Sequence, residues 1–485
     1  MCGICGVFHY GEGHADTGLV ERQQRVLTHR GPDDWDVWGE GPVALGHRRL
    51  SIVDLSSGGH QPMPNEDGSL RVTYNGELYG WPELKAVLAA RGHGFRGASD
   101  TEALLHLYEE HGDGLLQHLR GMFAFALYDR NRRRLLVARD RLGIKPLYYH
   151  DDGRRLAFAS ELKALMLDPG IPREVDEHAV ADFLTFQYVP SPGTIWKGVR
   201  KLPPGHRLAC DASGVRVERY WSLPVEPEPG HSGEYYRERL RALLAEAVRL
   251  RLVADVPLGA FLSGGVDSSV VVALMAQAVP EPIKTFSIGF DEREFSELED
   301  ARRVAVHLKT DHRELIVRPR ALEILPRLVW QMDEPFADAS MIPMHYLSEM
   351  ARREVKVALS GDGGDESFAG YATYEWAQRH AGLDRIPRAL RRIAGVPSWW
   401  FGPGTSLGRR LRRFSLDAAE RHLDAMSFFS EPELERIAGP ALHDTLRRHE
   451  PYAGPRLHHA RAAGPMGPVP ALLYLDAMTY MTDDV

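Results

Sequence analysis

The segment LSGGVDSS, residues 262–269, decides how the second half of this chain folds. The apolar run LGAF precedes it and predicts a strand, and a helical pattern, VDSSVVVALMAQAV, begins within it. Glycines 264 and 265 let backbone amides approach an anion closely, and a helix N-terminus attracts negative charge. The lysine of a Walker A loop is missing, so the segment predicts a phosphate-binding turn of another kind. A plain Gly-Ser turn is the structural alternative.

Helical and strand-like patterns alternate on both sides of this turn. Residues 235–253 carry apolar side chains at helical spacing, and residues 299–309 do so again. TFSIGF, residues 285–290, predicts a strand, and EVKVALSGDGGDE, residues 354–366, predicts a strand that ends in a second glycine-rich turn. Such βαβ alternation predicts a doubly wound parallel sheet with helices, an α/β domain.

The first 200 residues have a different pattern. Short segments rich in β-branched and aromatic residues are separated by Gly, Asp and Asn, with two helical segments between them. This predicts stacked antiparallel sheets with helices outside, an α+β layered domain. Residues 202–230 are rich in Pro and Gly, with one strand-like piece. We therefore expect a first domain over residues 1–205, a linker over 206–235 and a second domain over 236–485.

Composition excludes several classes of function. The chain has 485 residues, 44% of them hydrophobic and 26% charged, and a net charge of −8, which disfavours nucleic acid or an anionic membrane as a partner. No apolar run is long enough to span a membrane, and the N-terminus does not resemble a signal peptide. Cysteine occurs at positions 2, 5 and 210, too few for a disulfide framework and without zinc spacing. A reducing, cytoplasmic setting is expected.

Cys2 is the first candidate for chemistry. If Met1 is removed, which the small Gly3 favours, a thiol and a free α-amine share one residue. An α-amine has an ordinary pKa of about 7.7–8.0 and can act as a base near neutral pH, so Cys2 would carry both nucleophile and base. Taken alone, a cysteine at this position is more often a small buried residue.

Six further blocks give Cys2 a context. In chain order they are HRGPDD (29–34), GHRRLSIVDL (46–55), YNGELY (74–79), SDTE (99–102), LRGMFAFALYD (119–129) and ARDRLGIKPLYY (138–149). With them the first 205 residues resemble the class II glutamine amidotransferases, whose nucleophile is the N-terminal residue. The resemblance implies an Ntn-hydrolase αββα sandwich with glutaminase activity.

The resemblance also implies the roles of individual residues. Cys2 would attack the glutamine side-chain amide, and Asn75 and Gly76 would stabilise the oxyanion. Arg49 would pair with the substrate α-carboxylate, and Glu77 and Asp100 would bind its α-ammonium. Acidic residues at turns also cap or solvate, which is the alternative for the last two. Gly80 stands where the family usually has Asn.

In the second half, LSGGVDSS resembles the pyrophosphate loop SGGxDS of the N-type ATP-pyrophosphatases, which cleave ATP to AMP and pyrophosphate. The resemblance implies that Leu262 and Ile288 line the adenine, that Asp267 and Asp365 hold Mg²⁺, and that Glu366 accepts or relays a proton. The nucleotide-binding residues implied are Leu262, Ser263, Gly264, Gly265, Asp267, Ser268, Ser269, Ile288, Ser360 and Gly361. Ser367 stands where the family commonly has an apolar residue.

A glutaminase followed by an SGGxDS domain is the arrangement of the asparagine synthetase family. The implied substrates are glutamine, aspartate and ATP, and the implied assembly is a homodimer. Ammonia from Cys2 would displace AMP from an aspartyl-adenylate. The alternatives are another carboxylate acceptor and a degenerate non-catalytic homologue, while Cys2 argues against the β-lactam synthetases, which lack that nucleophile. The family continues past the block LLYLDAMTYMTDDV that ends this sequence, so a weakened synthetase or a glutaminase alone is also expected.

Overall fold

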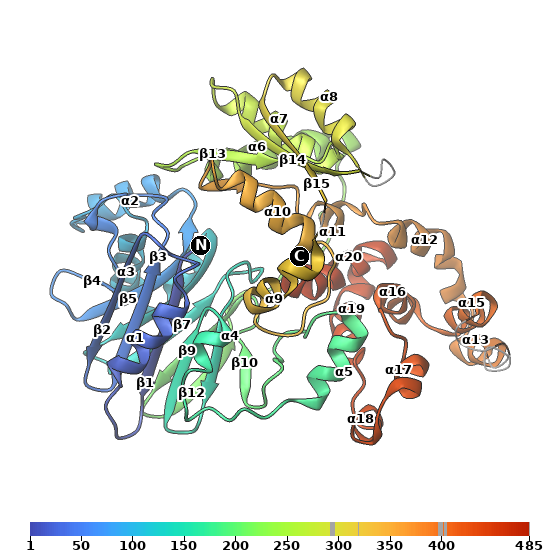
Figure 1. Ribbon diagram of the computed structural model, residues 1–485, viewed down its shortest axis with the longest axis horizontal. Coiled ribbons are helices and arrows are strands. Elements are labelled where there is room, and N and C mark those ends of the chain that lie inside the picture. The colour runs from blue at the N-terminus through green and yellow to red at the C-terminus, as the bar shows by residue number, and fades with distance from the viewer. Residues whose placement is uncertain (292–295, 319, 396–400, 402–404, 485) are drawn as a thin grey trace.

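The computed structural model describes residues 1–484 except 292–295, 319, 396–400 and 402–404. Figure 1 shows two twisted sheets packed face to face in the first half, a third sheet with its own helices, and a group of helices that ends the chain.

Two six-stranded antiparallel sheets form the first half. Sheet A has the order β10-β8-β9-β1-β3-β2, with bounds β1 (Gly3–His9), β2 (Asp34–Glu40), β3 (Val43–Arg49), β8 (Tyr148–Asp151), β9 (Arg155–Ala159) and β10 (Val199–Lys201). Sheet B has the order β12-β11-β7-β6-β5-β4, with bounds β4 (Met63–Pro64), β5 (Leu70–Leu78), β6 (Gly121–Asp129), β7 (Arg134–Arg139), β11 (His206–Asp211) and β12 (Gly214–Arg219).

Alternation along the strands produces three apolar layers. Residues such as Ile4 of sheet A and Ala124 of sheet B face the interior between the two sheets. The opposite face of sheet A is covered by α1 (Thr17–Val26) and α4 (Leu162–Leu165). The opposite face of sheet B is covered by α2 (Trp81–Ala90) and α3 (Thr101–His111). Because strand residues point alternately to the two faces, each sheet buries both. The expected αββα sandwich is confirmed.

The segment expected to be a linker, residues 206–235, is a hairpin in its first half. β11 pairs with β7 through four residues and with β12 through six, so sheet B continues to Arg219. Val215 and Val217 alternate with charged residues, a pattern that the surrounding prolines and glycines obscured. The unpaired connection begins after Arg219 and ends where α6 (Gly233–Arg251) begins.

The second half contains a four-stranded parallel sheet in the order β15-β14-β13-β16. Its strands are β13 (Leu258–Phe261), β14 (Lys284–Phe290), β15 (Asp311–Val317) and β16 (Val357–Leu359). One face packs against α6, α7 (Val266–Ala278) and α8 (Leu298–Leu308), and the other against α10 (Met341–Ala351), which α9 (Ala321–Met332) precedes. The doubly wound α/β sheet is confirmed. The strand order reverses between β13 and β16, and ligands of such sheets bind at this switch point.

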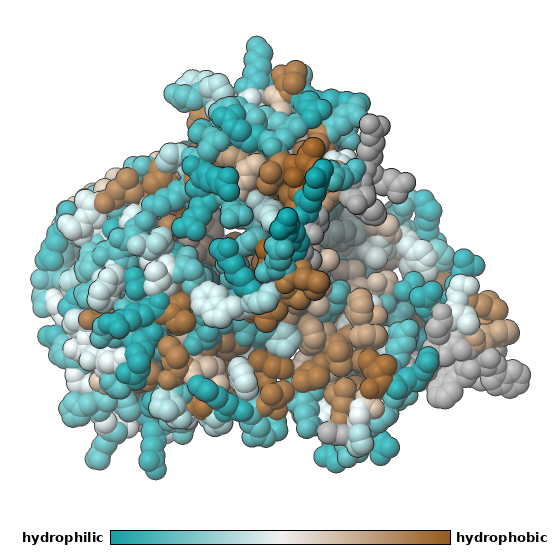
Figure 2. All heavy atoms as spheres, in the orientation of Figure 1, coloured by the Kyte–Doolittle hydropathy of each residue, from teal (hydrophilic) through white to brown (hydrophobic). Residues whose placement is uncertain are grey.

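Helices complete the chain. They are α11 (Gly364–Phe368), α12 (Ala372–His380), α13 (Arg388–Gly395), α15 (Ser406–Ser415), α16 (Ala418–Met426), α17 (Glu431–Ile437), α18 (Pro440–Leu446), α19 (Ala453–Met466), α20 (Pro468–Met478) and α21 (Tyr480–Asp483). Phe186, on α5 (Glu177–Phe186) of the first half, packs with Tyr374 and Leu472 of this group, so the two halves share a core. On the face in Figure 2, hydrophilic residues cover most of the sandwich. Within the described residues, no helix has the length and apolar character needed to cross a membrane.

Candidate active sites

A cavity of about 280 Å³ opens at the edge of the sandwich, where the N-terminus meets the parallel sheet. Its lining includes every residue that the sequence assigned to glutamine chemistry: Cys2, Arg49, Asn75, Gly76, Glu77 and Asp100. Cys2 directly precedes β1, Asp100 directly precedes α3, and the other four side chains come from β3 and β5, so folding gathers residues that lie almost 100 positions apart.

Cys2 lies directly before β1, and its backbone is held in place. Arg30 Nε donates to the Cys2 carbonyl at 2.9 Å, and the Leu50 amide lies 3.4 Å from Cys2 Sγ. Burial raises the pKa of the Cys2 thiol, so the thiol needs a base to become a nucleophile. Burial also lowers the pKa of the Met1 α-ammonium to about 5. An α-amine buried in this cavity is therefore neutral at pH 7 and free to accept a proton.

The buried side chain of Asn75 has unused hydrogen-bonding groups. It is 1% exposed, and neither its nitrogen nor its oxygen has a hydrogen-bond partner among the described residues. A buried amide without partners costs free energy, which a bound oxyanion would recover in part. At Gly76, an added Cβ would lie 2.5 Å from the Met122 carbonyl oxygen, so only glycine fits in this part of the cavity wall.

Arg49 is fixed by the loop that follows β3. Its guanidinium donates to the carbonyl oxygens of Ser56 at 2.9 Å and Val53 at 3.2 Å, and to that of Asp54. Gly59 packs directly on the guanidinium, since an added Cβ would overlap Nη2. The result is a rigid, buried positive charge at one wall of the cavity, suited to a carboxylate.

Glu77 and Asp100 form a strained acidic pair. Asp100 accepts hydrogen bonds from Tyr74 Oη at 3.1 Å and the Leu78 amide at 2.8 Å. Burial, and then the charge of Asp100, raise the pKa of Glu77 to about 8, and burial raises the pKa of Asp100 to about 6. A ligand ammonium placed between them would relieve this repulsion. The pair can therefore bind an amino group.

Two features of the cavity escaped the sequence analysis. Lys145 is a buried cation in the lining, and burial, followed by the charge of Arg30, lowers its pKa to about 8. It lies within the quoted block ARDRLGIKPLYY, which was the only available signal. Lys356, Val357 and Ala358 line the same cavity from the far half of the chain, and no local pattern predicts such a contact.

The loop of residues 262–269 leaves β13 and enters α7, as expected. Gly264 has φ +89°, and an added Cβ would lie 2.5 Å from the Ala301 amide nitrogen at the start of α8, so glycine is required. Ser263 Oγ lies 3.0 Å from Ser268 Oγ and accepts from the Gly265 amide at 3.2 Å. These bonds hold the turn open at the helix N-terminus, where an anion is favoured.

The second glycine-rich turn packs against the first. Added Cβ atoms would lie 2.8 Å from the Ser268 amide at Gly361 and 2.4 Å from Asp267 Cγ at Gly364. β13 and β16 are adjacent parallel strands, so both turns emerge at one edge of the sheet, at the switch point. The structure thus brings Asp267 beside the turn that carries Asp365.

Asp267 and Asp365 suit a hard divalent cation. Burial, and then the charge of Asp365, raise the pKa of Asp267. Two neighbouring carboxylates are a donor set that Mg²⁺ prefers when phosphate oxygens complete its coordination. The residues therefore fit Mg²⁺.

The other expected positions have distinct environments. Leu262 is buried under β14, and Ile288 packs beside Phe286 on the face covered by α10. Ser269 Oγ is buried without a hydrogen-bond partner in the part of the chain that the structure describes, and Ser360 Oγ donates to Asp362 at 2.7 Å. These positions flank the paired turns.

Glu366 is 2% exposed and accepts from Tyr371 Oη at 2.6 Å. The two departures from the family pattern have local explanations. Gly80 has φ +73°, a conformation open to both Gly and Asn, and Ser367 Oγ donates to the Gly363 carbonyl at 2.7 Å.

The segment DEPFADASMIP, residues 333–343, joins the two halves. Asp333 lies 3.0 Å from Lys163 Nζ, and Lys163 also pairs with Glu161 at 2.6 Å. Glu161 then pairs with Arg30 at 2.8 Å, the residue that holds the Cys2 carbonyl. Ion pairs thus connect Asp333 in the second half to Arg30, which donates a hydrogen bond to the backbone of Cys2.

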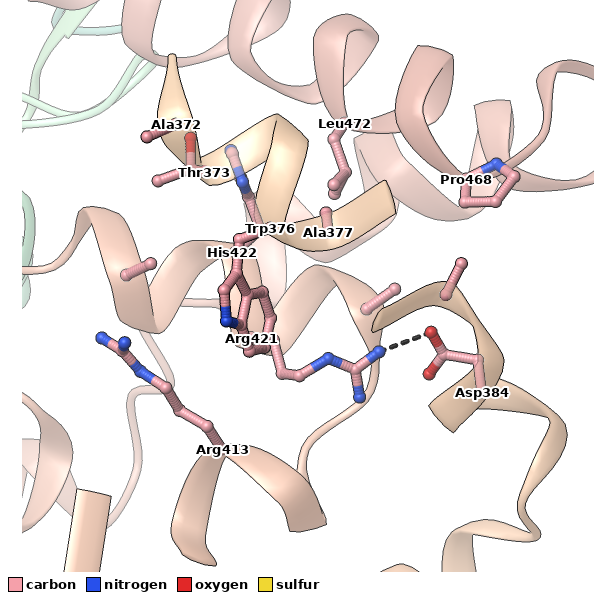
Figure 3. Close-up of a pocket in the computed structure, with 13 residues that line it drawn as sticks. Ala372, Thr373, Trp376, Ala377, Asp384, Arg413, Arg421, His422, Pro468 and Leu472 are labelled. Atoms are coloured by element: carbon pink, nitrogen blue, oxygen red, sulfur yellow. Dashed lines mark hydrogen bonds and ion pairs between the residues drawn. The ribbon is translucent and has the colours of Figure 1, made fainter. Parts of the chain in front are cut away.

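A second cavity, of about 200 Å³, lies among the C-terminal helices and is shown in Figure 3. Arg421 pairs with Asp384 across it, and Trp376, His422 and Leu472 line it. None of the site residues expected from the sequence contributes to it.

Comparison with known proteins agrees with this arrangement. Residues 1–221 match the family described as Glutamine amidotransferase domain, and residues 239–485 match the family described as Asparagine synthase. Asparagine synthetase (glutamine-hydrolyzing) 1 of Bacillus subtilis is 36% identical over 398 residues, which cover 81% of this chain and 62% of that protein. Asparagine synthetase (glutamine-hydrolyzing) 3 of the same organism is 34% identical, with 82% and 68% covered.

A fungal relative, Amidase chry2 of Gibberella zeae, is 34% identical over 416 residues, which cover 77% of this chain and 60% of that protein. The chain thus spans about two thirds of the length of these relatives. It belongs to the asparagine synthase family, with a glutamine amidotransferase domain followed by a synthetase domain.

Proposed function

We propose that this chain transfers the amide nitrogen of glutamine to the side-chain carboxylate of aspartate at the expense of ATP. The observation that carries the proposal is the shared wall of the glutamine cavity. Lys356–Ala358 line that cavity, and Ser360 and Gly361 at the other end of the same strand begin the turn against Asp267. One short strand therefore contacts both reaction centres.

In the first reaction, Cys2 Sγ attacks the side-chain carbonyl carbon of glutamine, and its proton passes to the α-amine of the same residue. Asn75 and the Gly76 amide stabilise the oxyanion, and Arg49, Glu77 and Asp100 hold the amino-acid end. Collapse of the tetrahedral species breaks the C–N bond, releases ammonia and leaves a thioester, which water hydrolyses to glutamate. Met1 must be removed for this amine to exist.

In the second reaction, an aspartate carboxylate oxygen attacks the α-phosphorus of ATP, which releases pyrophosphate and leaves an acyl-adenylate. Ammonia attacks that carbonyl carbon and displaces AMP. The turns at 262–269 and 360–366 bind the nucleotide, and Glu366 accepts a proton from the attacking ammonia. Mg²⁺ held by Asp267 and Asp365 would neutralise phosphate charge.

A second acceptor class has its own support. The relative called Amidase chry2 bears a name that does not specify asparagine, and Ser367 places a polar group beside Glu366. Transfer to another carboxylate, in a peptide or secondary-metabolite pathway, is therefore the second candidate.

The setting is also part of the proposal. Cys2, Cys5 and Cys210 are all free thiols, which fits a reducing cytoplasm. A homodimer follows from the family resemblance, and sedimentation of the purified chain tests it.

The test compares nitrogen donors. Wild type with aspartate, ATP and Mg²⁺ should form asparagine, AMP and pyrophosphate with either glutamine or ammonium. Cys2→Ala should lose only the glutamine-driven reaction, and Cys210→Ala, a thiol in the sandwich core, should behave as wild type. AMP formation with other carboxylates but not with aspartate would favour the second candidate. No AMP with any acceptor would contradict a synthetase, and a degenerate homologue would then remain.

A further inference from the structure

Two histidines and a glutamate converge on the outer surface of sheet B, apart from both reaction centres. His93 follows α2, and His106 and Glu109 lie three residues apart on α3, so they share one helix face. One ligand atom from each of the three side chains lies within 4.8 Å of the others. His93 Nδ1 is 3.3 Å from Glu109 Oε2, and His106 Nδ1 is 3.1 Å from the same oxygen.

The hydrogen-bond partner of Nε2 in each ring determines whether Nδ1 carries a hydrogen or a lone pair. His106 Nε2 lies 3.1 Å from the Gly94 carbonyl oxygen, which can only accept, so this nitrogen carries the hydrogen. His93 Nε2 lies 3.2 Å from Glu110 Oε1 and donates in the same way. In neutral rings both Nδ1 lone pairs therefore point at the carboxylate oxygen of Glu109.

Three lone pairs directed at one another repel unless a positive charge lies between them. A single divalent metal ion satisfies all three atoms at once. Ligand bonds of about 2.0–2.1 Å in a tetrahedral site place neighbouring ligand atoms about 3.3 Å apart, which is close to the two separations found here.

The surroundings match those of a metal site. Metal-bound histidines commonly donate their other N–H to a carboxylate or a backbone carbonyl, as His93 and His106 do. Asn65 Nδ2 donates to Glu109 Oε1 at 2.8 Å, which orients the carboxylate and leaves Oε2 for the ion. His106 is 1% exposed and is locked further by edge-on contact with Phe95.

We propose that His93, His106 and Glu109 form a binding site for one Zn²⁺ ion, with water in the remaining position. Two imidazoles and one carboxylate are a zinc donor set. The ion would join the segment after α2 to α3. Asp100, directly before α3, and Thr101, its first residue, line the glutamine cavity, and Thr101 lies about 7.5 Å before His106 at 1.5 Å per residue. The site would thus brace the helix that positions Asp100.

The test uses the full chain without a histidine tag, stripped with a chelator and titrated with Zn²⁺ by calorimetry. Co²⁺ serves as a spectroscopic probe, because tetrahedral coordination gives intense visible bands. We expect one ion per chain and a rise in the thermal midpoint on binding. Glu109→Gln, which keeps the side-chain shape, and His93→Ala should each weaken affinity by about tenfold or more. Circular dichroism establishes that each variant is folded.

His118→Ala is the matched control, because His118 stacks on His111 at 4.1 Å on the same surface and belongs to no such triad of the described residues. It should leave affinity unchanged. Absence of stoichiometric binding to the wild-type chain would overturn the proposal. Zn²⁺ binding of wild-type affinity in folded Glu109→Gln would also overturn it. An equal loss of affinity in His118→Ala would do the same, because either result would mean that the ion binds surface histidines without a specific site.

Discussion

Lys356 Nζ lies 2.7 Å from Asp33 Oδ2. Lys356 lines the glutamine cavity and directly precedes β16, the strand that leads to the nucleotide turn. Asp33 also accepts from the Ser51 amide at 2.8 Å. Burial acts to raise the pKa of Asp33, but the hydrogen bonds from Lys356 and the Ser51 amide and the charges of Lys356 and Arg49 together outweigh it, so the pKa is lowered. The pair thus aligns β16 with the loop behind Cys2.

Lys356→Met tests this alignment. Both side chains are about one third exposed, so solvent screens the pair and its loss should cost about 1 kcal/mol or less. We expect a rise in the glutamine KM of about fivefold at most, and more glutamate released per amide product formed. Lys197→Met removes an exposed ion pair away from the cavity and should change neither quantity. If Lys356→Met releases the same amount of glutamate per amide product as wild type, the contact is only structural.

Lys145 should set the pH dependence of glutamine hydrolysis. Its charge lowers the pKa of the thiol of Cys2 and of the nearby α-amine, although burial is the largest influence on both. Lys145→Met should therefore move the acid limb of kcat/KM to higher pH, and activity at a pH below that limb should fall by about tenfold for every pH unit that the limb moves. Lys145→Arg keeps the charge and should restore the wild-type profile in part. A uniform loss at every pH, with the limb in its wild-type place, would assign Lys145 to packing alone.

Glu77 should lower the stability of the free protein while it contributes to glutamine binding. Burial raises its pKa from 4.5 to about 8, so the stability that the protonated group contributes is fully present below pH 4.5 and is lost progressively as pH rises from there through 8. Glu77→Gln should raise the thermal midpoint most at pH 9, raise it less at pH 6, leave it nearly unchanged at pH 4, and raise the glutamine KM. Saturating glutamine should stabilise wild type more than the variant. An equal midpoint for both proteins at pH 9 would contradict the acidic pair.

Asp267 should matter only to the ATP-dependent reaction. Asp267→Asn, or removal of Mg²⁺ with EDTA, should reduce ammonium-driven AMP formation by about a hundredfold or more, because phosphate charge would lose its counter-charge. Glutamine hydrolysis should persist. Asp311→Asn changes an exposed carboxylate at the amino end of β15 and should have no effect. Retention of AMP formation in Asp267→Asn would remove Asp267 from the nucleotide site.

The sequence predicts those parts of the fold that depend on the pattern of neighbouring residues. The alternation in segments such as MFAFALYD predicted the layered sandwich, and the strand, glycine turn and helix around Gly264 predicted the parallel sheet. All six glutamine-site residues were expected and share one cavity. The Pro and Gly around residues 206–219 outweigh a short alternating pattern and predict a linker there, although β11 pairs with β7 and β12 pairs with β11.

Contacts between distant segments could not be read from the sequence. The approach of Lys356 to Asp33 spans 323 positions, and no periodic pattern links them. The same holds for Asp333 and Lys163, and for the shared core of Phe186 and Tyr374. The convergence of His93 with His106 and Glu109 also depends on how the segment after α2 folds back on α3.

The most direct test of the central claim follows one nitrogen atom. Wild-type chain is given glutamine labelled with ¹⁵N at the side-chain amide, aspartate, ATP and Mg²⁺, with excess unlabelled ammonium, and the product amide is analysed by mass spectrometry. Two reaction centres that share β16 predict product that carries ¹⁵N, formed with one AMP and one pyrophosphate each. Product diluted to the isotopic ratio of the bulk ammonium, or glutamate formed without AMP, would contradict a coupled enzyme.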